Sequence, residues 1–197
     1  MDPFYSGAAA PFCSGVDTGG LGNDLLSGGG NDDMLSGGGG DDDLYGSIGN
    51  DMMSGGDDND YLSGGSNNDT LTGGGDDDTL VGGDGDDVFA YEFDLNGEGT
   101  SLSVLTVSAD FGSDLILDMT TDDTIRFDVD TGTAAAANIT DFFSVTRTGG
   151  ATGDVNIRLL STTTGATEAT ITLEGIADGA IGSIADLETA GYTIDFV

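Results

Sequence analysis

A nine-residue unit repeats eight times in one unbroken phase between residues 19 and 90 of this 197-residue chain. Each unit begins with glycine, has aspartate at its sixth position and has an apolar side chain at its eighth. The sixth-position residues are Asp24, Asp33, Asp42, Asp51, Asp60, Asp69, Asp78 and Asp87. The eighth-position residues are Leu26, Leu35, Leu44, Met53, Leu62, Leu71, Leu80 and Phe89. A period this short and regular predicts a repeat architecture built from one recurring structural element.

The first half of each unit has the composition of a tight turn. Glycine occupies the second position everywhere except at Ser47, and only Gly, Asn and Asp occupy the fourth. These three residue types enter left-handed backbone at the least cost. The fourth-position residues are Gly22, Asn31, Gly40, Gly49, Asp58, Asn67, Asp76 and Gly85. We therefore expect a turn of unusual geometry in every unit, followed by a three-residue strand whose middle side chain points inward.

Two units would form one coil of turn, strand, turn and strand. Stacked coils then place the eighth-position side chains in a ladder between two parallel sheets, which is an all-β fold. No unit can bury its apolar residue alone, so stability comes from stacking. Ordering the chain costs about 1–2 kcal/mol per residue, and one inward side chain per unit does not offset that cost unaided.

The stacked aspartates predict a bound cation. Units on the same edge are two units apart, which places Asp51 between Asp33 and Asp69. Calcium takes six to eight oxygen ligands at about 2.3–2.6 Å from carboxylates and backbone carbonyls, whereas magnesium requires a compact octahedron. Zinc and copper are disfavoured because the units contain no His and no Cys. We predict calcium ions bound by the sixth-position carboxylates and by the backbone of the fourth-position residues.

The unit GGxGxDx-apolar-x resembles the repeats-in-toxin (RTX) nonapeptide. This resemblance implies a right-handed parallel β-roll with calcium between its turns. Residues 114–127 are similar to the segment that follows the last repeat in RTX exoproteins. The ending Asp195, Phe196 and Val197 is similar to the uncleaved signal that type I secretion machinery reads. The resemblance therefore implies a bacterial protein that is exported by this route and acts outside the cell.

Three segments are expected: a leader that caps the first coil at residues 1–18, the roll at 19–90, and a C-terminal β domain at 91–197. Short runs rich in Val, Ile, Leu, Phe and Thr predict strands at 101–108, 114–119, 124–129, 142–147, 154–160, 168–173 and 192–197. Their spacing predicts an antiparallel, sandwich-like domain that carries the secretion signal. Phe89, Tyr91 and Phe93 are expected to pack at the junction with the roll. Cys13 is the single cysteine, so no disulfide forms within the chain.

Composition limits the partners and the chemistry. A formal charge of −34, with three arginines as the only Lys or Arg residues, excludes a basic surface for nucleic acid. No run approaches the roughly eighteen apolar residues of a transmembrane segment. The chain has no histidine, which removes HExxH zinc sites and His-dependent nucleophilic catalysis. No GxSxG or GxxxxGK motif is present, and we expect no enzymatic activity.

These observations predict a calcium-binding module that stays unfolded where calcium is scarce and folds on binding calcium after export. Two alternatives remain open. One is a stand-alone adhesion or matrix protein that uses calcium to contact an extracellular surface or polysaccharide. The other is an accessory module of a secreted hydrolase or polysaccharide-modifying enzyme.

Overall fold

The computed structural model describes residues 15–94, 113–119, 123–130, 143–147, 155–160, 167–173, 187–188 and 193–196. The first strands are β1 (Val16–Leu21), β2 (Leu25–Gly30), β3 (Met34–Gly39), β4 (Asp43–Ile48), β5 (Met52–Asp57), β6 (Tyr61–Ser66), β7 (Thr70–Gly74), β8 (Thr79–Asp84) and β9 (Val88–Asp94). The later strands are β10 (Ser113–Ile116), β11 (Thr124–Asp130), β12 (Phe143–Arg147), β13 (Val155–Leu160), β14 (Thr167–Leu173) and β15 (Thr193–Phe196). The predicted strand at 101–108 and most of the predicted leader lie outside the described residues. The end of the leader belongs to β1, so the roll begins before residue 19.

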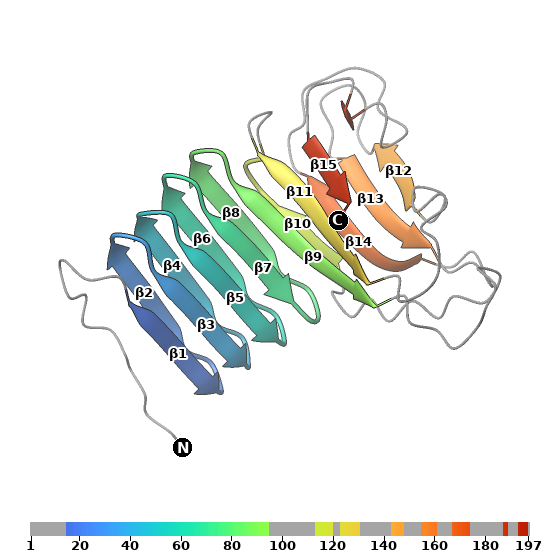
Figure 1. Ribbon diagram of the computed structural model, residues 1–197. Coiled ribbons are helices and arrows are strands. Elements are labelled where there is room, and N and C mark those ends of the chain that lie inside the picture. Colours follow the sequence, from blue (N-terminus) through green and yellow to red (C-terminus); the bar gives the residue numbers. More distant parts are fainter. Residues whose placement is uncertain are drawn as a thin grey trace.

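The repeat strands form two parallel sheets that enclose a common core (Figure 1). One sheet has the order β1-β3-β5-β7-β9-β11-β15, and the other has the order β12-β13-β14-β10-β8-β6-β4-β2. Neighbouring repeat strands are related by one coil of two units, as the pairs Leu26↔Leu44 and Leu35↔Met53 show. This register confirms the prediction of a parallel β-solenoid with two units in each coil.

The strands are longer than predicted because the glycines also pair. β3 contains the last three residues of one unit and the first three of the next. Its pairing with β5 skips one residue and then continues at Gly38↔Gly56. The prediction of three-residue strands is therefore wrong, because the start of each turn still forms hydrogen bonds with the next coil.

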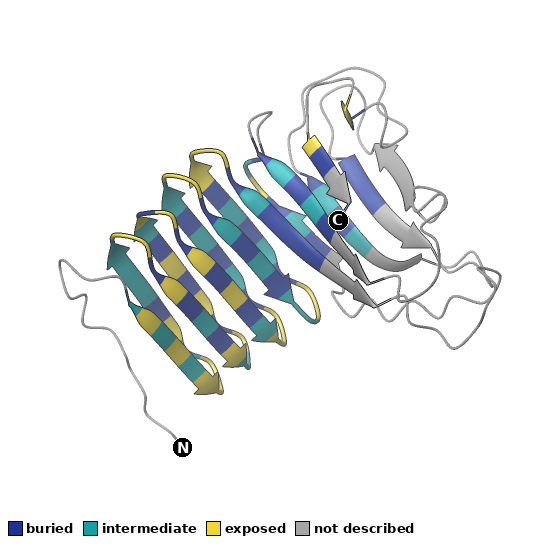
Figure 2. Cartoon of the chain, viewed as in Figure 1, coloured by how far each residue is buried: buried dark blue, intermediate teal, exposed yellow. Residues whose placement is uncertain are grey.

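The core of the roll is the predicted ladder of eighth-position side chains. All eight are between 0% and 2% exposed, while the seventh- and ninth-position residues are exposed or half-buried, with the exception of Ala90. Figure 2 shows the result as a buried band that crosses neighbouring strands at the same level. Burying a Leu or Met side chain contributes about 1.5–3 kcal/mol, so the ladder supplies the apolar part of the stability of each coil.

Several C-terminal strands extend the roll. β10 pairs in parallel with β8, β11 with β9, and β15 with β11. Within the described residues, antiparallel pairing is confined to β12–β13 and β13–β14. The prediction of antiparallel strands is right for the pairs β12–β13 and β13–β14 and wrong for β10, β11 and β15, and β14 also pairs in parallel with β10. The physical reason is that Ile116 and Ile125 pair with the eighth-position residues Leu80 and Phe89, so these strands continue the apolar ladder.

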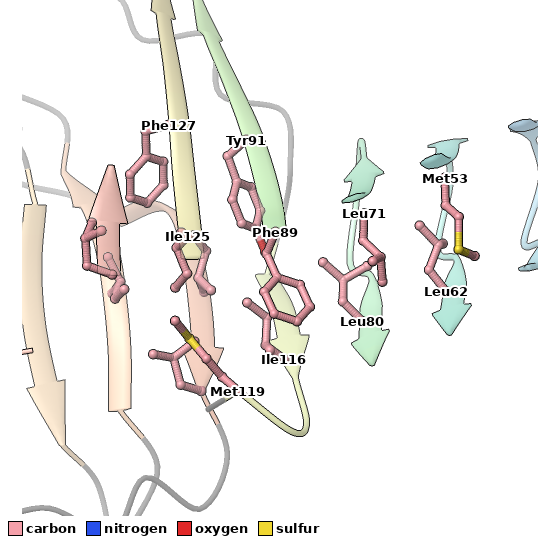
Figure 3. Packing of buried hydrophobic residues seen from close by; sticks show 14 of the residues in the cluster. Met53, Leu62, Leu71, Leu80, Phe89, Tyr91, Ile116, Met119, Ile125 and Phe127 are labelled. Atoms are coloured by element: carbon pink, nitrogen blue, oxygen red, sulfur yellow. The ribbon is translucent and has the colours of Figure 1, made fainter. Parts of the chain in front are cut away.

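The ladder widens into a larger core where the repeats end (Figure 3). Phe89 and Tyr91 from β9 lie with Ile116 from β10 and with Ile125 and Phe127 from β11, each at most 3% exposed. The ring centroids of Tyr91 and Phe127 are 5.8 Å apart. This packing confirms that Phe89 and Tyr91 bury their side chains at the junction, while the side chain of Phe93 lies outside the described residues.

Candidate metal centre

The turns have the left-handed backbone that the second and fourth positions predict. Ser47, the one second-position residue that is not glycine, has a φ of 86°. Fourth-position φ values run from 69° at Asp76 to 150° at Gly85. The four fourth-position residues other than glycine are Asn or Asp, which tolerate this region better than other side chains do. Their side chains are exposed, so only their backbone atoms face the inside of the turn.

The sixth-position carboxylates form a ladder that joins successive coils. Oδ1 of Asp51 accepts a hydrogen bond from the backbone N–H of Asp33 at 2.8 Å, eighteen residues earlier. The N–H of Asp51 in turn donates to Oδ1 of Asp69 at 2.8 Å. The same contact joins Asp24 to Asp42, Asp42 to Asp60, Asp60 to Asp78, and Asp69 to Asp87. The structure therefore brings together the aspartate pairs that the repeat spacing predicts.

The second oxygen of each carboxylate is left without a partner. Oδ2 is buried and accepts no hydrogen bond in all eight sixth-position aspartates. From Asp33 onward these residues are between 1% and 6% exposed. A buried carboxylate oxygen with no donor is costly unless a cation compensates it. Two regular rows of such oxygens, one on each edge of the roll, are what a series of cation sites requires.

Burial raises the pKa values of several of these carboxyl groups. It raises the pKa of Asp60 to about 6 and the pKa values of Asp69 and Asp78 to about 7. The backbone N–H that each carboxylate accepts lowers its pKa, and neighbouring aspartates raise it further. Without a cation, the folded turns therefore hold these aspartates closer to protonation than the unfolded chain does.

The first-position glycines leave space for converging oxygen atoms. A Cβ placed on Gly64 would overlap Oδ2 of Asp69 and would lie 2.7 Å from the carbonyl oxygen of Gly82 in the next coil. Gly55 has the same surroundings, with Asp60 and the carbonyl of Gly73. No left-handed φ is recorded at these glycines, so their role is space and not backbone freedom. A carboxylate and a backbone carbonyl thus approach each other at each such turn.

These donors fit calcium. Within the described ranges, no three Asp, Glu or Cys side chains form a cluster of their own, and a calcium shell at these turns would draw on backbone carbonyls as well as carboxylates. At the fourth position, a Cβ on Gly85 would overlap the carbonyl oxygen of Asn67 in the preceding coil, and Gly49 meets Asn31 in the same way. Fourth-position carbonyls therefore point toward the neighbouring turn. An all-oxygen set of carboxylates and carbonyls is the set that calcium prefers.

A second ladder of hydrogen bonds, which the sequence analysis did not predict, runs in the opposite direction on the surface. Asn50 N–H donates to Oδ1 of Asp32 at 2.8 Å, and Asn68 N–H donates to Oδ1 of Asn50 at 3.1 Å. Asn59, Asp77 and Asp86 make equivalent bonds to the preceding coil. The signal was present in the sequence, because the fifth position is Asn or Asp in every unit. Opposed ladders fix each turn against both of its neighbours.

Acidic residues beyond the repeats also take part. Asp114 and Asp123 accept the backbone N–H groups of Asp78 and Asp87 at 3.0 and 2.9 Å. Asp118 accepts the N–H groups of Gly82 and Gly83 at 2.9 and 2.8 Å. Asp114 was not among the predicted site residues, although it sits at the end of one row of turns.

The comparison with protein families agrees with this geometry. The family model for the RTX calcium-binding nonapeptide repeat (4 copies) matches residues 18–53 and 54–89. A search of curated proteins finds no match. No helix in the part of the chain that the structure describes has the length and apolar character of a membrane span.

Three solved structures are similar to the chain. The AlgE6R2 subunit of the Azotobacter vinelandii mannuronan C5-epimerase is 26% identical, with 83% of this chain and 84% of that chain covered and a TM-score of 0.41. The extracellular lipase LipA from Serratia marcescens is 17% identical over 87% of this chain and 38% of its own, with a TM-score of 0.35. The AlgE6R3 subunit of the same epimerase is 22% identical, with 98% of this chain and 85% of that chain covered and a TM-score of 0.29.

The repeat, the carboxylate ladder and the matched family describe the same segment. Units that start with glycine and carry an inward aspartate stack into a parallel β-roll. Each turn presents a buried carboxylate oxygen and backbone carbonyls to its neighbour. Residues 18–89 therefore belong to the RTX family of calcium-binding nonapeptide repeats.

Proposed function

We propose that this chain is a secreted, non-catalytic module whose roll folds when calcium enters its turns. The observation that carries the proposal is the two rows of buried carboxylate oxygens, eight in all, without hydrogen-bond partners. An ionised carboxylate in such a place costs several kcal/mol unless a positive charge compensates it. The chain has three Lys and Arg residues against 37 Asp and Glu, so it cannot supply that charge itself. The absence of histidine supports a structural role over a catalytic one.

The proposed ligands are the sixth-position carboxylates and the fourth-position carbonyls. The carboxylates belong to Asp24, Asp33, Asp42, Asp51, Asp60, Asp69, Asp78 and Asp87. The carbonyls belong to Gly22, Asn31, Gly40, Gly49, Asp58, Asn67, Asp76 and Gly85. Each ion would lie between two turns of the same edge, so that one aspartate serves the sites on both of its sides.

Folding would then depend on where the chain is. Where calcium is scarce, repulsion between stacked carboxylates keeps the chain unfolded, which suits passage through the type I secretion machinery. Outside the cell, calcium at the affinity of extracellular modules, about 10⁻⁴–10⁻³ M, binds only the folded roll. Each site adds about 1.4 kcal/mol of stability for a tenfold excess of calcium over its dissociation constant.

A calcium titration followed by far-UV circular dichroism tests this function, with magnesium as the control ion. A transition from coil to β-structure with calcium alone is the expected result. Asp51→Ala removes a carboxylate shared by two sites and should raise the calcium concentration at the midpoint. A chain that is fully β-structured in chelator would refute calcium-dependent folding.

Exposed side chains on the roll favour a second candidate, calcium-dependent contact with an extracellular surface or polysaccharide. Met34 and Met52 are neighbours in register on one outer face and are 47% and 54% exposed. On the other sheet, the rings of Tyr45 and Tyr61 lie 5.8 Å apart. Retention on polysaccharide-coated or cell-coated beads, with and without calcium, tests this role. Equal passage through coated and bare beads in both conditions would exclude it.

A further inference from the structure

One outer face of the roll carries no charge across four neighbouring strands, β1, β3, β5 and β7. We call this surface the neutral face, and its seventh- and ninth-position residues are Val16, Thr18, Met34, Ser36, Met52, Ser54, Thr70 and Thr72. Val16 and Thr18 take these positions because they pair with Met34 and Ser36. The second positions of the same strands are glycines. On the opposite sheet, by contrast, Asp43 occupies a seventh position.

Large apolar side chains are exposed in one row of the neutral face. Val16, Met34 and Met52 pair in register across β1, β3 and β5, and they are 70%, 47% and 54% exposed. With the exception of Leu117, every large apolar side chain that is exposed in the described ranges lies between residues 16 and 52. Contiguous exposed apolar side chains, unlike scattered ones, indicate an interaction surface.

Exposed aspartates lie on both edges of the roll, at the turns that flank the neutral face. They occupy third, fourth and fifth positions of the units, and they are Asp32, Asp41, Asp57, Asp58, Asp76, Asp77, Asp84 and Asp86. Their side chains are not the proposed calcium ligands, which are the buried sixth-position carboxylates and the fourth-position carbonyls. These edges therefore stay negative when calcium occupies the turns.

The spacing of the apolar row matches an α-helix that lies along the roll and crosses the strands. Neighbouring strands are about 4.7–4.9 Å apart, so successive side chains of the row have this separation. Residues three or four apart in an α-helix are separated by about 4.5–6 Å along its axis. An amphipathic helix can therefore place one apolar side chain beside each of Val16, Met34 and Met52.

The width of the neutral face determines which charges such a helix needs. β3 and β5 have six residues each, which corresponds to a length of about 20 Å, and a helix with its side chains is about 10–12 Å wide. About 4–5 Å remain between the helix and each acidic edge, a distance that Lys and Arg side chains can span. A helix with an apolar stripe between two basic flanks thus complements both the row and the edges.

We propose that the neutral face binds a basic amphipathic helix of a partner protein, with the helix axis along the roll. The sequence has no lysine and three arginines, so it does not supply such a helix itself. The apolar row provides the buried contact, and the acidic edges attract the partner and fix its orientation. This interaction goes beyond calcium-dependent folding, because it assigns a partner to a face that holds none of the proposed calcium ligands.

Fluorescence anisotropy with a labelled synthetic Leu/Lys peptide tests the interaction at saturating calcium. The leucines follow the pattern i, i+3, i+4 and i+7, which forms an apolar stripe on a helix. A scrambled peptide of the same composition keeps the charge without the stripe, and a Leu/Glu peptide keeps the stripe with the opposite charge. The Leu/Lys peptide should bind at least about tenfold more tightly than either control. Equal binding of the Leu/Lys and scrambled peptides would reduce the contact to charge alone and overturn the proposal.

Variants of the full chain locate the contact. Met34→Ser combined with Met52→Ser introduces the residue that already occupies the ninth position of both strands, and it should weaken binding by about tenfold or more. Leu25→Ser combined with Tyr45→Ser is the matched control, because these side chains are 50% and 39% exposed on the opposite sheet. The control should change binding by less than about twofold. An equal loss in both variants would show that the neutral face is not the binding surface.

The outcomes separate this interaction from the proposed function. The peptide comparison uses the wild-type chain alone, so its result stands even where a variant fails to fold. A roll that is already folded in chelator would refute calcium-dependent folding and leave the peptide comparison valid. A folded wild-type chain that does not bind the Leu/Lys peptide would overturn the proposal, and retention on polysaccharide-coated beads would then assign the exposed side chains to the second candidate function.

Discussion

Replacing Asp42 with asparagine separates the role of a metal ligand from that of a hydrogen-bond acceptor. Oδ1 of Asp42 accepts the N–H of Asp24 at 2.7 Å, and an asparagine oxygen can accept the same bond. The unpartnered Oδ2 becomes an NH₂ group, which cannot bind a cation. Asp41 is the matched control, because its side chain is exposed and its Oδ1 accepts the N–H of Asn59 at 3.2 Å. Both variants remove one negative charge, but only Asp42→Asn removes a buried ligand.

The expected shift follows from the number of sites. Six aspartate pairs within the repeats are joined by the carboxylate ladder, and Asp42 belongs to two of them. With one calcium ion for each pair, the variant keeps four of the six sites. Each site stabilises the fold by RT ln(1 + [Ca]/Kd), so a wild-type midpoint at about ten times Kd moves to about 35 times Kd. The midpoint should therefore rise roughly threefold to fourfold.

The assay is a titration with buffered calcium at neutral pH, followed by far-UV circular dichroism. Asp41→Asn should shift the midpoint by less than about 1.5-fold, because solvent and salt screen an exposed charge. In chelator, Asp42→Asn should retain at least as much β-structure as the wild type, since burial raises the pKa of Asp42 and so disfavours its charged form. Equal midpoint shifts in the two variants would show that net charge, and not coordination, sets the calcium requirement.

Three further predictions follow from the turns. Gly55→Ala places a Cβ 2.6 Å from the Gly73 carbonyl oxygen and should lower the free energy of unfolding by about 1–3 kcal/mol, measured in urea with calcium present. Gly30→Ala is the control, because a Cβ there meets nothing within 4 Å and should change the free energy of unfolding by less than about 1 kcal/mol. Ser47→Gly removes a side chain from a backbone with φ of 86° and should stabilise the calcium-loaded chain by about 1 kcal/mol, measured by thermal unfolding. Burial raises the pKa of Asp69 from 3.8 to about 7 in the calcium-free fold, so this group's contribution to stability is complete below about pH 4 and is lost as the pH rises through 7. Circular dichroism in chelator should therefore show β-structure declining between these pH values, and a calcium-free signal that grows with pH would contradict it.

The roll could be predicted because its determinants recur at one period. An inward Leu and an inward Asp two residues apart define the strand and the turn together, and repetition removes the ambiguity of a single copy. The first-position glycines were recognised as turn residues, but their physical role is to leave space for Asp oxygens and the next carbonyl. That role depends on a neighbouring coil, which no single unit reveals.

The C-terminal half was harder to predict for a related reason. Alternating apolar residues indicate a strand but do not state the direction of its partner, so β10 and β11 were expected to pair antiparallel. Asp114-Leu115-Ile116 also fits an ordinary strand, and without paired glycines its phase with the repeats is not visible. Only the pairing of Ile116 with Leu80 identifies it as a further rung of the ladder.

The carboxylate ladder also gives the stack a polarity. Asp60 accepts the N–H of Asp42, and Asp42 accepts that of Asp24, so each of these buried carboxylates holds the coil that precedes it in the sequence. Among the described residues, the last acceptors of this ladder are Asp114 and Asp123, whereas β1 lies at the opposite end with Val16 and Leu21 70% and 89% exposed. We therefore expect folding to start at the C-terminal end of the roll and to add earlier coils toward the N-terminus. Fraying on loss of calcium would begin at β1 and travel the other way.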